Sequence, residues 1–119
     1  MVDDVAEQRE LATHMLLKLG YVVMAVASGE EAVAYLENRH VDLVLLDMIM
    51  DPGIDGLETY TRILKSHPFQ RAVIVSGYAE TERVKQAQQM GAGPYVKKPY
   101  LIDRLGIAIR SDLDREDVA

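Results

Sequence analysis

Cysteine is absent from this chain of 119 residues, and long hydrophobic runs are also missing. The lack of cysteine excludes a disulfide framework, a zinc-thiolate site and a cysteine nucleophile. The longest continuous apolar run, Tyr21–Ala27, is too short to span a bilayer, and the first residues have neither the cationic start nor the apolar core of a signal peptide. We therefore expect a cytoplasmic protein that has no membrane partner.

Positive charge is also scarce. The chain has 13 Lys and Arg residues against 19 Asp and Glu residues, and its formal net charge is −6. Because binding to nucleic acid requires a basic face that neutralises phosphates, this balance argues against a nucleic-acid partner. The length and the 49% of hydrophobic residues suit one globular domain.

Short apolar stretches rich in β-branched residues alternate with helical stretches along the chain. The predicted strands are Tyr21–Ala27, Val41–Leu46, Ala72–Val75 and Pro94–Val96, and the predicted helices are Val5–Leu19, Ser28–Arg39, Gly56–Ser66, Thr81–Met90 and Leu101–Asp112. Such alternation with short connections predicts a parallel sheet covered by helices on both faces. Only Met1 and Val2 could supply a strand ahead of the first helix, so a strand at that point is abbreviated.

Polar side chains follow the predicted strands at the point where each strand ends. In chain order they are Asp3 and Asp4, Asp47, Ser76, and Lys97 and Lys98. Ligands of open α/β sheets bind at the carboxyl ends of the strands, so we expect these side chains to converge on one rim. Three clustered carboxylates need a cation, and oxygen-only ligands favour Mg²⁺. A lysine suits a phosphoryl group, and Asp47, at the end of a buried strand, is the best candidate for an aspartyl-phosphate nucleophile.

Five short motifs stand in register along the chain. They are Val2-Asp3-Asp4, Leu45-Leu46-Asp47-Met48, Asp55-Gly56-Leu57-Glu58, Val75-Ser76-Gly77 and Tyr95-Val96-Lys97-Lys98-Pro99. Together they resemble the receiver domain of two-component response regulators, and the loop after Asp47 is similar to those of receivers in hybrid sensor histidine kinases. The resemblance covers residues 2–113 and leaves 114–119 as a tail, so that 1–119 form a single receiver domain. It implies a flavodoxin-like, doubly wound, parallel five-stranded sheet of order 2-1-3-4-5 with five helices.

The resemblance also implies roles for individual residues. Asp47 is then the acceptor of a phosphoryl group from a histidine kinase or a phosphotransfer protein. Mg²⁺ is bound by the side chains of Asp4 and Asp47, by the backbone carbonyl of Ile49, and by Asp3 through water. Lys98 pairs with the phosphoryl group beside a cis Lys98–Pro99 bond.

The same resemblance implies a switch. Ser76 is the hydroxyl that is drawn toward the phosphoryl group, and Tyr95 is the aromatic side chain that turns inward in response. The face made by the fourth helix, the last strand and the last helix carries the signal to a protein partner. We expect no enzymatic activity beyond the domain's own phosphorylation and a slow dephosphorylation, because Ile49 and Tyr78, which flank the phosphoryl position, are bulky and are not bases.

Two features depart from the family pattern. Receivers have three to five apolar residues before the acidic pair, whereas this sequence has only Met1 and Val2. Either the first strand is a stub or the start is truncated, and an unpaired edge invites strand borrowing in a homodimer. The loop after Asp47 also contains one extra residue, Asp51.

Three interpretations of function therefore stand side by side. The first is a phosphoacceptor switch, either a stand-alone regulator or the receiver piece of a larger hybrid kinase. The second is a pseudo-receiver that binds a partner without phosphorylation because its first strand is stunted. The third is a Mg²⁺-dependent phosphohydrolase, although such enzymes place a second carboxylate two residues after the nucleophile and this chain has Ile49 there.

Overall fold

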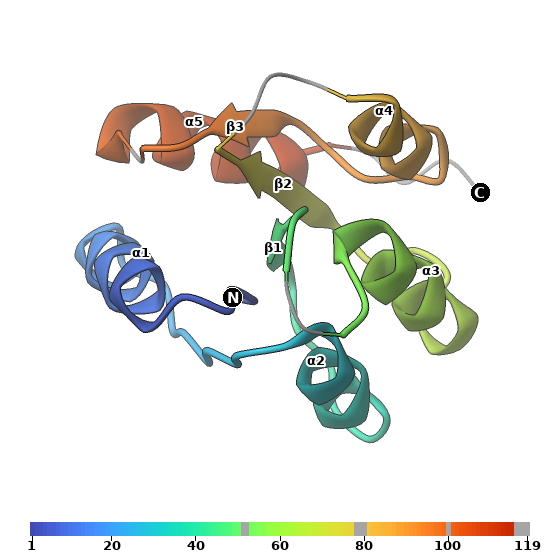
Figure 1. Ribbon diagram of the computed structural model, residues 1–119. Helices are drawn as coiled ribbons and strands as arrows, with labels where there is room; N and C mark the ends of the chain where they lie inside the picture. The colour runs from blue at the N-terminus through green and yellow to red at the C-terminus, as the bar shows by residue number, and fades with distance from the viewer. Residues whose placement is uncertain (51–52, 78–80, 100, 116–119) are drawn as a thin grey trace.

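The computed structural model describes residues 1–50, 53–77, 81–99 and 101–115, and eight helices and strands follow one another in this part of the chain (Figure 1). They are α1 (Ala6–Lys18), α2 (Gly29–Leu36), β1 (Val44–Asp47), α3 (Gly56–Ser66), β2 (Ala72–Ser76), α4 (Glu82–Gln89), β3 (Tyr95–Lys97) and α5 (Ile102–Leu113). The five predicted helices are all present. None of the helices in the described ranges is both long and apolar enough to cross a membrane.

The strands form a parallel sheet of order β1-β2-β3. Within the described residues the predicted strand over 21–27 is not formed, and the prediction of five strands is not met. Val2 makes isolated parallel bridges to Val26 on one side and to Leu46 of β1 on the other. A strand exists only through a ladder of backbone hydrogen bonds. The amino-terminal segment pairs with the stretch at 21–27 through Val2 alone, so this stretch has no ladder.

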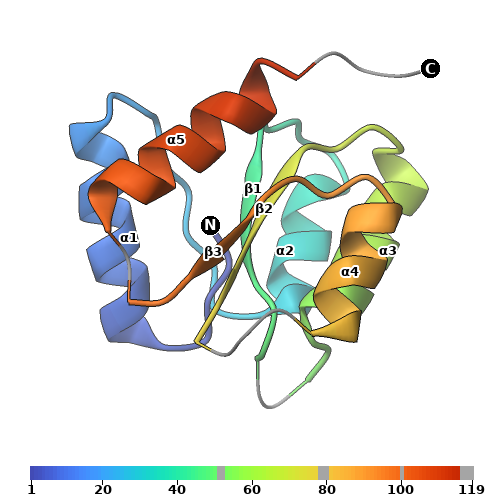
Figure 2. The same ribbon diagram turned by 90° about the horizontal axis from the view of Figure 1, so that it is seen from above.

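Helices cover both faces of the sheet (Figure 2). Helices α1 and α5 lie on one face, and α2, α3 and α4 lie on the other. Every residue of β1 and β2 is buried, and successive side chains enter opposite clusters: Val44 and Leu46 pack toward α2 and α3, whereas Leu45 packs toward α1 and α5. This two-sided burial explains why the strands read as continuous apolar runs rather than as alternating ones.

Local hydrogen bonds fix where α2 and β1 begin and end. Helix α2 begins after Ser28, whose hydroxyl accepts from the Glu31 N–H. It ends at Leu36 rather than at the predicted Arg39, and the Leu36 carbonyl lies 2.6 Å from Nε2 of His67, at the end of α3. Strand β1 likewise begins three residues later than predicted, at Val44, whose N–H makes the first ladder bond, to the Arg71 carbonyl.

Candidate functional site

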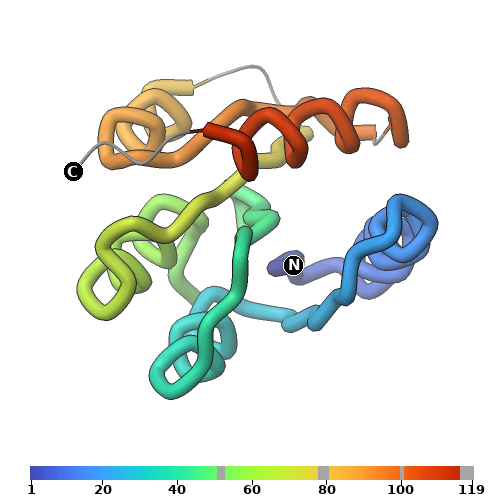
Figure 3. Tube along the Cα trace, turned by 180° about the vertical axis from the view of Figure 1, so that it is seen from behind, coloured from blue at the N-terminus to red at the C-terminus, as the bar shows by residue number. Residues whose placement is uncertain are grey.

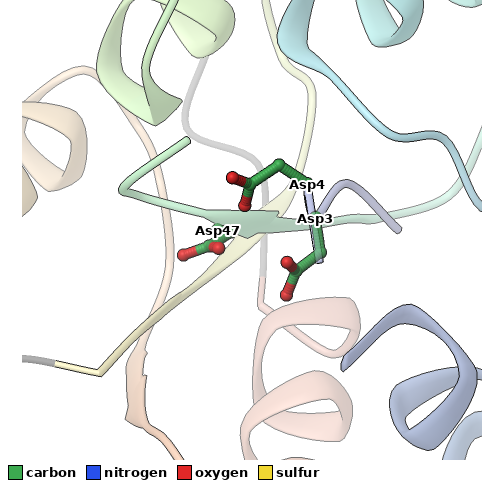
Figure 4. A group of neighbouring side chains, drawn as sticks. All are labelled: Asp3, Asp4 and Asp47. Carbon is green, nitrogen blue, oxygen red and sulfur yellow. The ribbon is translucent and has the colours of Figure 1, made fainter. Parts of the chain in front are cut away.

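Three aspartates meet at the carboxyl end of β1 (Figure 4). Asp3 and Asp4 come from the amino-terminal segment, which bridges to β1 through Val2, and Asp47 is the last residue of β1. One carboxylate oxygen from each lies within 4.8 Å of the others. Asp3 and Asp47 are 0% and 4% exposed, so water screens their charges poorly.

Lys98 supplies the positive charge that faces two of these carboxylates. Its Nζ atom donates to Oδ2 of Asp3 at 2.8 Å and to Oδ2 of Asp47 at 3.1 Å, and its side chain is only 15% exposed. The Lys98 N–H donates to the Ser76 carbonyl at 2.8 Å, which ties the lysine to the end of β2. The Lys98–Pro99 peptide bond is cis. Lys97, its neighbour, is exposed.

Backbone groups hold two of the carboxylates in place. Oδ1 of Asp3 accepts from the Val5 N–H at 2.9 Å, and Oδ1 of Asp47 accepts from the Ile49 N–H at 3.3 Å. The Asp3 carbonyl accepts from the Arg9 guanidinium at 2.8 Å. Sequence reasoning missed Arg9, because an arginine on the first turns of a helix is ordinary and only the folded chain shows what it contacts.

The remaining predicted residues lie around this cluster. Ser76 ends β2 and is 1% exposed. The sheet register places it opposite Lys97 and one residue after Val75, which pairs with Asp47. Tyr95, at the start of β3, is half-buried against the apolar cluster of α3 and α4. Ile49 is 49% exposed. Asp51 and Tyr78, together with residues 116–119 of the predicted tail, lie outside the described residues.

Burial and charge act against each other at Asp47. Burial raises the pKa of its carboxyl from the usual 3.8 to about 6, and the nearby Asp3 charge adds to the rise, while Lys98 opposes it. The same two carboxylates raise the pKa of the Lys98 ammonium, although burial acts in the opposite direction. At neutral pH the site therefore holds an ionised Asp47 and a protonated Lys98. Burial makes the ionised form of Asp47 costly, and the Lys98 ammonium offsets only part of that cost.

The pKa of Asp47 predicts how stability depends on pH. Because the folded state binds the Asp47 proton more tightly than the unfolded chain, the stabilisation is fully present below about pH 4 and is lost as the pH rises through about 6. This difference in proton affinity between the folded and unfolded states corresponds to about 3 kcal/mol in the free energy of unfolding between low and neutral pH. In chelator-treated buffer, Asp47→Asn is therefore expected to unfold at higher urea concentration than the wild type at about pH 7.5, and at a similar concentration near pH 4.

Urea unfolding curves at the two pH values, followed by circular dichroism, measure this difference. Asp42→Asn is the matched control, because Asp42 is exposed and precedes the same strand. Equal midpoints for Asp47→Asn and the wild type at neutral pH would contradict the prediction.

The donor atoms of the cluster fit Mg²⁺. All three side chains offer carboxylate oxygens, and the ligating groups gathered here include neither histidine nor cysteine. Hard oxygen ligands at a partly open site are the set that Mg²⁺ prefers. The buried carboxylates of Asp3 and Asp47 both contact the Lys98 ammonium, and a divalent cation would further reduce the repulsion between them.

Comparison with known proteins gives the same picture. The family model for the response regulator receiver domain matches residues 1–110. The chain belongs to the response regulator receiver domain family. The predicted family is thereby confirmed, as is the general fold of a parallel sheet with five helices.

Individual relatives and solved structures cover nearly the whole receiver domain. The chain is 32% identical to sporulation initiation phosphotransferase F of Bacillus subtilis (strain 168) over 113 residues, which are 95% of this chain and 90% of that protein. The CheY-like receiver domain protein of Methanospirillum hungatei JF-1 superimposes with a TM-score of 0.86 at 30% identity, over 95% of this chain and 90% of that one. The receiver domain of NtrX from Brucella abortus gives 0.89 at 29% identity, over 97% of both chains.

Other relatives are much longer than this receiver domain. The transcriptional regulatory protein DctD of Rhizobium meliloti (strain 1021), which acts in C4-dicarboxylate transport, is 33% identical over 105 residues, but these are only 23% of its length. Receiver domains of one family thus occur in proteins with different further parts, and the likeness to DctD concerns the receiver domain alone.

Proposed function

We propose that this receiver domain takes a phosphoryl group from a phosphohistidine onto Asp47. The donor is a histidine kinase or a phosphotransfer protein. The observation that carries the proposal is the position of the Asp47 carboxylate, at the end of β1, with the Lys98 ammonium 3.1 Å away and two further carboxylates beside it. This arrangement presents a nucleophilic oxygen together with a cation for the incoming phosphate.

The transfer is a displacement at phosphorus. A carboxylate oxygen of Asp47 forms a bond to phosphorus while the bond from phosphorus to the imidazole nitrogen of the donor breaks, and the electron pair of that bond stays on the nitrogen. The imidazole leaves as the neutral ring when its other nitrogen is already protonated, and otherwise it takes a proton from water. Mg²⁺, held by the side chains of Asp4 and Asp47 and by the Ile49 carbonyl, with Asp3 reached through water, would offset the charge of the phosphoryl oxygens. Lys98 supplies a second positive charge and positions the Asp47 carboxylate.

Phosphorylation changes the balance of charges at the rim. A phosphoryl group adds about −1.5 to −2 charges and three acceptor oxygens. Lys98 and the Ser76 hydroxyl are the donors proposed to turn toward these oxygens. The Lys98 N–H donates to the Ser76 carbonyl, and β2 pairs with β3. A movement of Ser76 toward the phosphoryl group would therefore also move β3 and Tyr95. The face formed by α4, β3 and α5 is the proposed surface for the downstream protein.

Phosphoryl uptake tests this function. Incubation with acetyl phosphate and Mg²⁺, followed by intact-mass measurement, is expected to show one added phosphoryl group in the wild type and none in Asp47→Asn. Asp42→Asn, which removes an exposed aspartate five residues earlier, is expected to behave like the wild type.

Two other results would each overturn the proposal. Steady release of free phosphate without accumulation of the adduct would indicate a phosphohydrolase. Absence of any adduct at saturating Mg²⁺ would indicate a pseudo-receiver that signals without phosphorylation. Omission of Mg²⁺ in a parallel sample tests the metal, since uptake is then expected to fall to the level of Asp47→Asn.

A further inference from the structure

The short segment between Val2 and α1 carries two of the three clustered aspartates. Figure 3 shows the chain running from the centre of the fold directly into α1. Val2 makes the bridges to its neighbours and α1 begins at Ala6, so Asp3, Asp4 and Val5 are the whole connection between them. The positions of the Asp3 and Asp4 carboxylates therefore depend on how this connection is held.

The backbone of Asp3 is fixed at its N–H group and at its carbonyl group. The N–H donates to the Val26 carbonyl at 3.2 Å, and the carbonyl accepts from the Arg9 guanidinium at 2.8 Å. The side chain is also held, because Oδ1 accepts from the Val5 N–H. Asp3 is 0% exposed, so its carbonyl is withdrawn from bulk water and Arg9 supplies a charged donor in place of water.

Helix geometry explains why Arg9 reaches this carbonyl. Arg9 lies one turn into α1, and its N–H donates to the Val5 carbonyl at 3.0 Å. Side chains of an α-helix lean toward its amino terminus, so a long side chain at this position extends back over the residues that precede the helix. Val5, at the N-cap position, makes no side-chain cap. Arg9 therefore fastens the first turn of α1 to the two aspartates.

The carbonyl that Arg9 holds belongs to the peptide group between Asp3 and Asp4. Because a peptide group is planar, a hydrogen bond that fixes its carbonyl also fixes the direction of the bond to Cα of Asp4. Figure 4 shows the Asp3 and Asp4 side chains leaving the segment on opposite sides. Asp4 is half-buried and contributes a carboxylate oxygen to the cluster. Rotation of this peptide group would turn that carboxylate away from Asp47.

Arg9 and Lys98 act on Asp3 in different ways. Lys98 donates to its carboxylate, whereas Arg9 donates to its backbone carbonyl. A positive charge near a cation site lowers cation affinity by repulsion, so the charge of Arg9 by itself would weaken Mg²⁺ binding. The hydrogen bond acts in the opposite direction, because a group that orients a metal ligand raises the affinity for the metal. The two effects predict opposite signs when Arg9 is removed.

We propose that Arg9 is a positioning residue for Mg²⁺: by holding the Asp3 carbonyl, it directs the Asp4 carboxylate into the acidic cluster and raises the affinity of the cluster for the metal. The inference rests on the proposed function, since it concerns the Mg²⁺ that the proposed phosphoryl transfer uses. Arg9 acts through the backbone and contacts neither the metal nor the phosphoryl group.

Binding of Mn²⁺ measures this effect without phosphoryl transfer. Mn²⁺ takes the same oxygen ligands as Mg²⁺, and electron paramagnetic resonance measures the free ion. Arg9→Met is expected to raise the Kd for Mn²⁺ about tenfold, as is usual for loss of a residue that orients a metal ligand. Lys97→Met, which removes an exposed positive charge at the end of β3, is the matched control and is expected to leave the Kd unchanged or to lower it.

A double-mutant cycle tests whether Arg9 acts through Asp4. In Asp4→Asn the ligand that Arg9 directs is already lost, so adding Arg9→Met is expected to raise the Kd by less than about twofold. A general loosening of the fold would instead raise the Kd by the same factor in both backgrounds. If Arg9→Met does not fold, Arg9→Gln, whose amide ends short of the guanidinium position, takes its place in the cycle with the same expected values.

The Mg²⁺ dependence of phosphoryl uptake gives a second measurement. Arg9→Met is expected to need about tenfold more Mg²⁺ than the wild type for half-maximal uptake from acetyl phosphate. At saturating Mg²⁺ its rate of uptake is expected to lie within about twofold of the wild-type rate, because Arg9 touches no reacting atom. A change in the metal requirement without a change in the limiting rate is the mark of a residue that positions the metal ligands.

Three results would overturn the inference. They are a Kd of Arg9→Met for Mn²⁺ that is equal to or lower than that of the wild type, an equal rise of the Kd in both backgrounds of the cycle, and a loss of uptake that saturating Mg²⁺ does not restore. Failure of the proposed function is distinguishable from these, because the wild type itself would then take up no phosphoryl group. Failure of this inference alone leaves wild-type uptake and its Mg²⁺ dependence intact.

Discussion

Replacement of Lys98 by methionine is expected to lower the free energy of unfolding by about 3–5 kcal/mol at neutral pH, the usual effect of removing one partner from a buried ion pair. The Lys98 ammonium is 2.8 Å from Asp3 and 3.1 Å from Asp47, and neither carboxylate has significant access to water. Methionine keeps the apolar part of the lysine side chain, so the decrease in the free energy of unfolding measures the effect of the charge rather than of packing. Phosphoryl uptake from acetyl phosphate is also expected to fall, by about 100-fold or more.

The pH dependence separates this effect from a general packing defect. Without Lys98, the pKa of Asp47 is expected to rise further above about 6, because its main opposing influence is gone. The raised pKa stabilises the folded state at low pH and is lost as the pH increases, so the deficit of Lys98→Met should be smallest near pH 5 and largest near pH 8. Added Mg²⁺ should restore part of the stability at about pH 8.

Lys97→Met provides the matched control for the lysine. Lys97 is the adjacent residue, it is exposed, and its substitution is expected to change the free energy of unfolding by less than about 0.5 kcal/mol. Urea unfolding at several pH values and intact-mass measurement give both readouts. A deficit of equal size in the two variants, or a Lys98→Met deficit that does not depend on pH, would show that the ammonium does not neutralise the aspartates.

Replacement of Gly56 by alanine is expected to destabilise the fold by about 1–3 kcal/mol or more. Gly56 is the first residue of α3, and its N–H donates to the Met48 carbonyl at 2.9 Å. A Cβ atom at this position would lie 2.5 Å from the Asp47 carbonyl oxygen and 2.7 Å from Cα of Met48. Both are backbone atoms at the end of β1, so α3 must move away from the sheet or Asp47 must shift.

Gly106→Ala is the matched control for the glycine. Gly106 lies within α5, and a Cβ atom there would meet only the side chain of Leu19, at 3.4 Å. Because alanine is the better helix former, this variant is expected to gain about 0.5–1 kcal/mol. Opposite signs for the two substitutions in urea unfolding are the expected result. A neutral Gly56→Ala would mean that α3 does not need its close approach to β1.

The candidate site could be predicted from the sequence to a large extent. Asp47 follows a run of apolar residues, and the rule that ligands bind at the carboxyl ends of parallel strands places it with Asp3, Asp4, Ser76 and Lys98. The structure brings the three aspartates together and places Lys98 against two of them. The sequence could not show that the Lys98 ammonium contacts Asp3 and Asp47, or that Arg9 holds the Asp3 carbonyl, since both depend on side-chain positions after folding.

The limits of prediction are clearest in the stretch at 21–27. Its apolar, β-branched composition predicts a strand, and along residues 21–24 burial alternates in the manner of a strand, with Val22 fully exposed. A strand nevertheless needs a ladder of hydrogen bonds on at least one side, and in the described residues this stretch has only the isolated bridge between Val26 and Val2. The composition of residues 21–27 gives them a preference for an extended backbone. Whether they form a strand depends on hydrogen bonds to another segment of the chain, which local composition does not determine.

The sequence by itself indicated the family through the resemblance of its five short motifs. It also determined the alternation of helices and strands and the positions of the acidic residues, because these depend on local periodicity, on capping residues and on the fixed relation between strand ends and ligand sites. Only the tertiary structure decided how far the sheet extends, which carboxylates share the Lys98 charge, and where the amino terminus lies. These properties depend on pairing and burial between segments far apart in the chain.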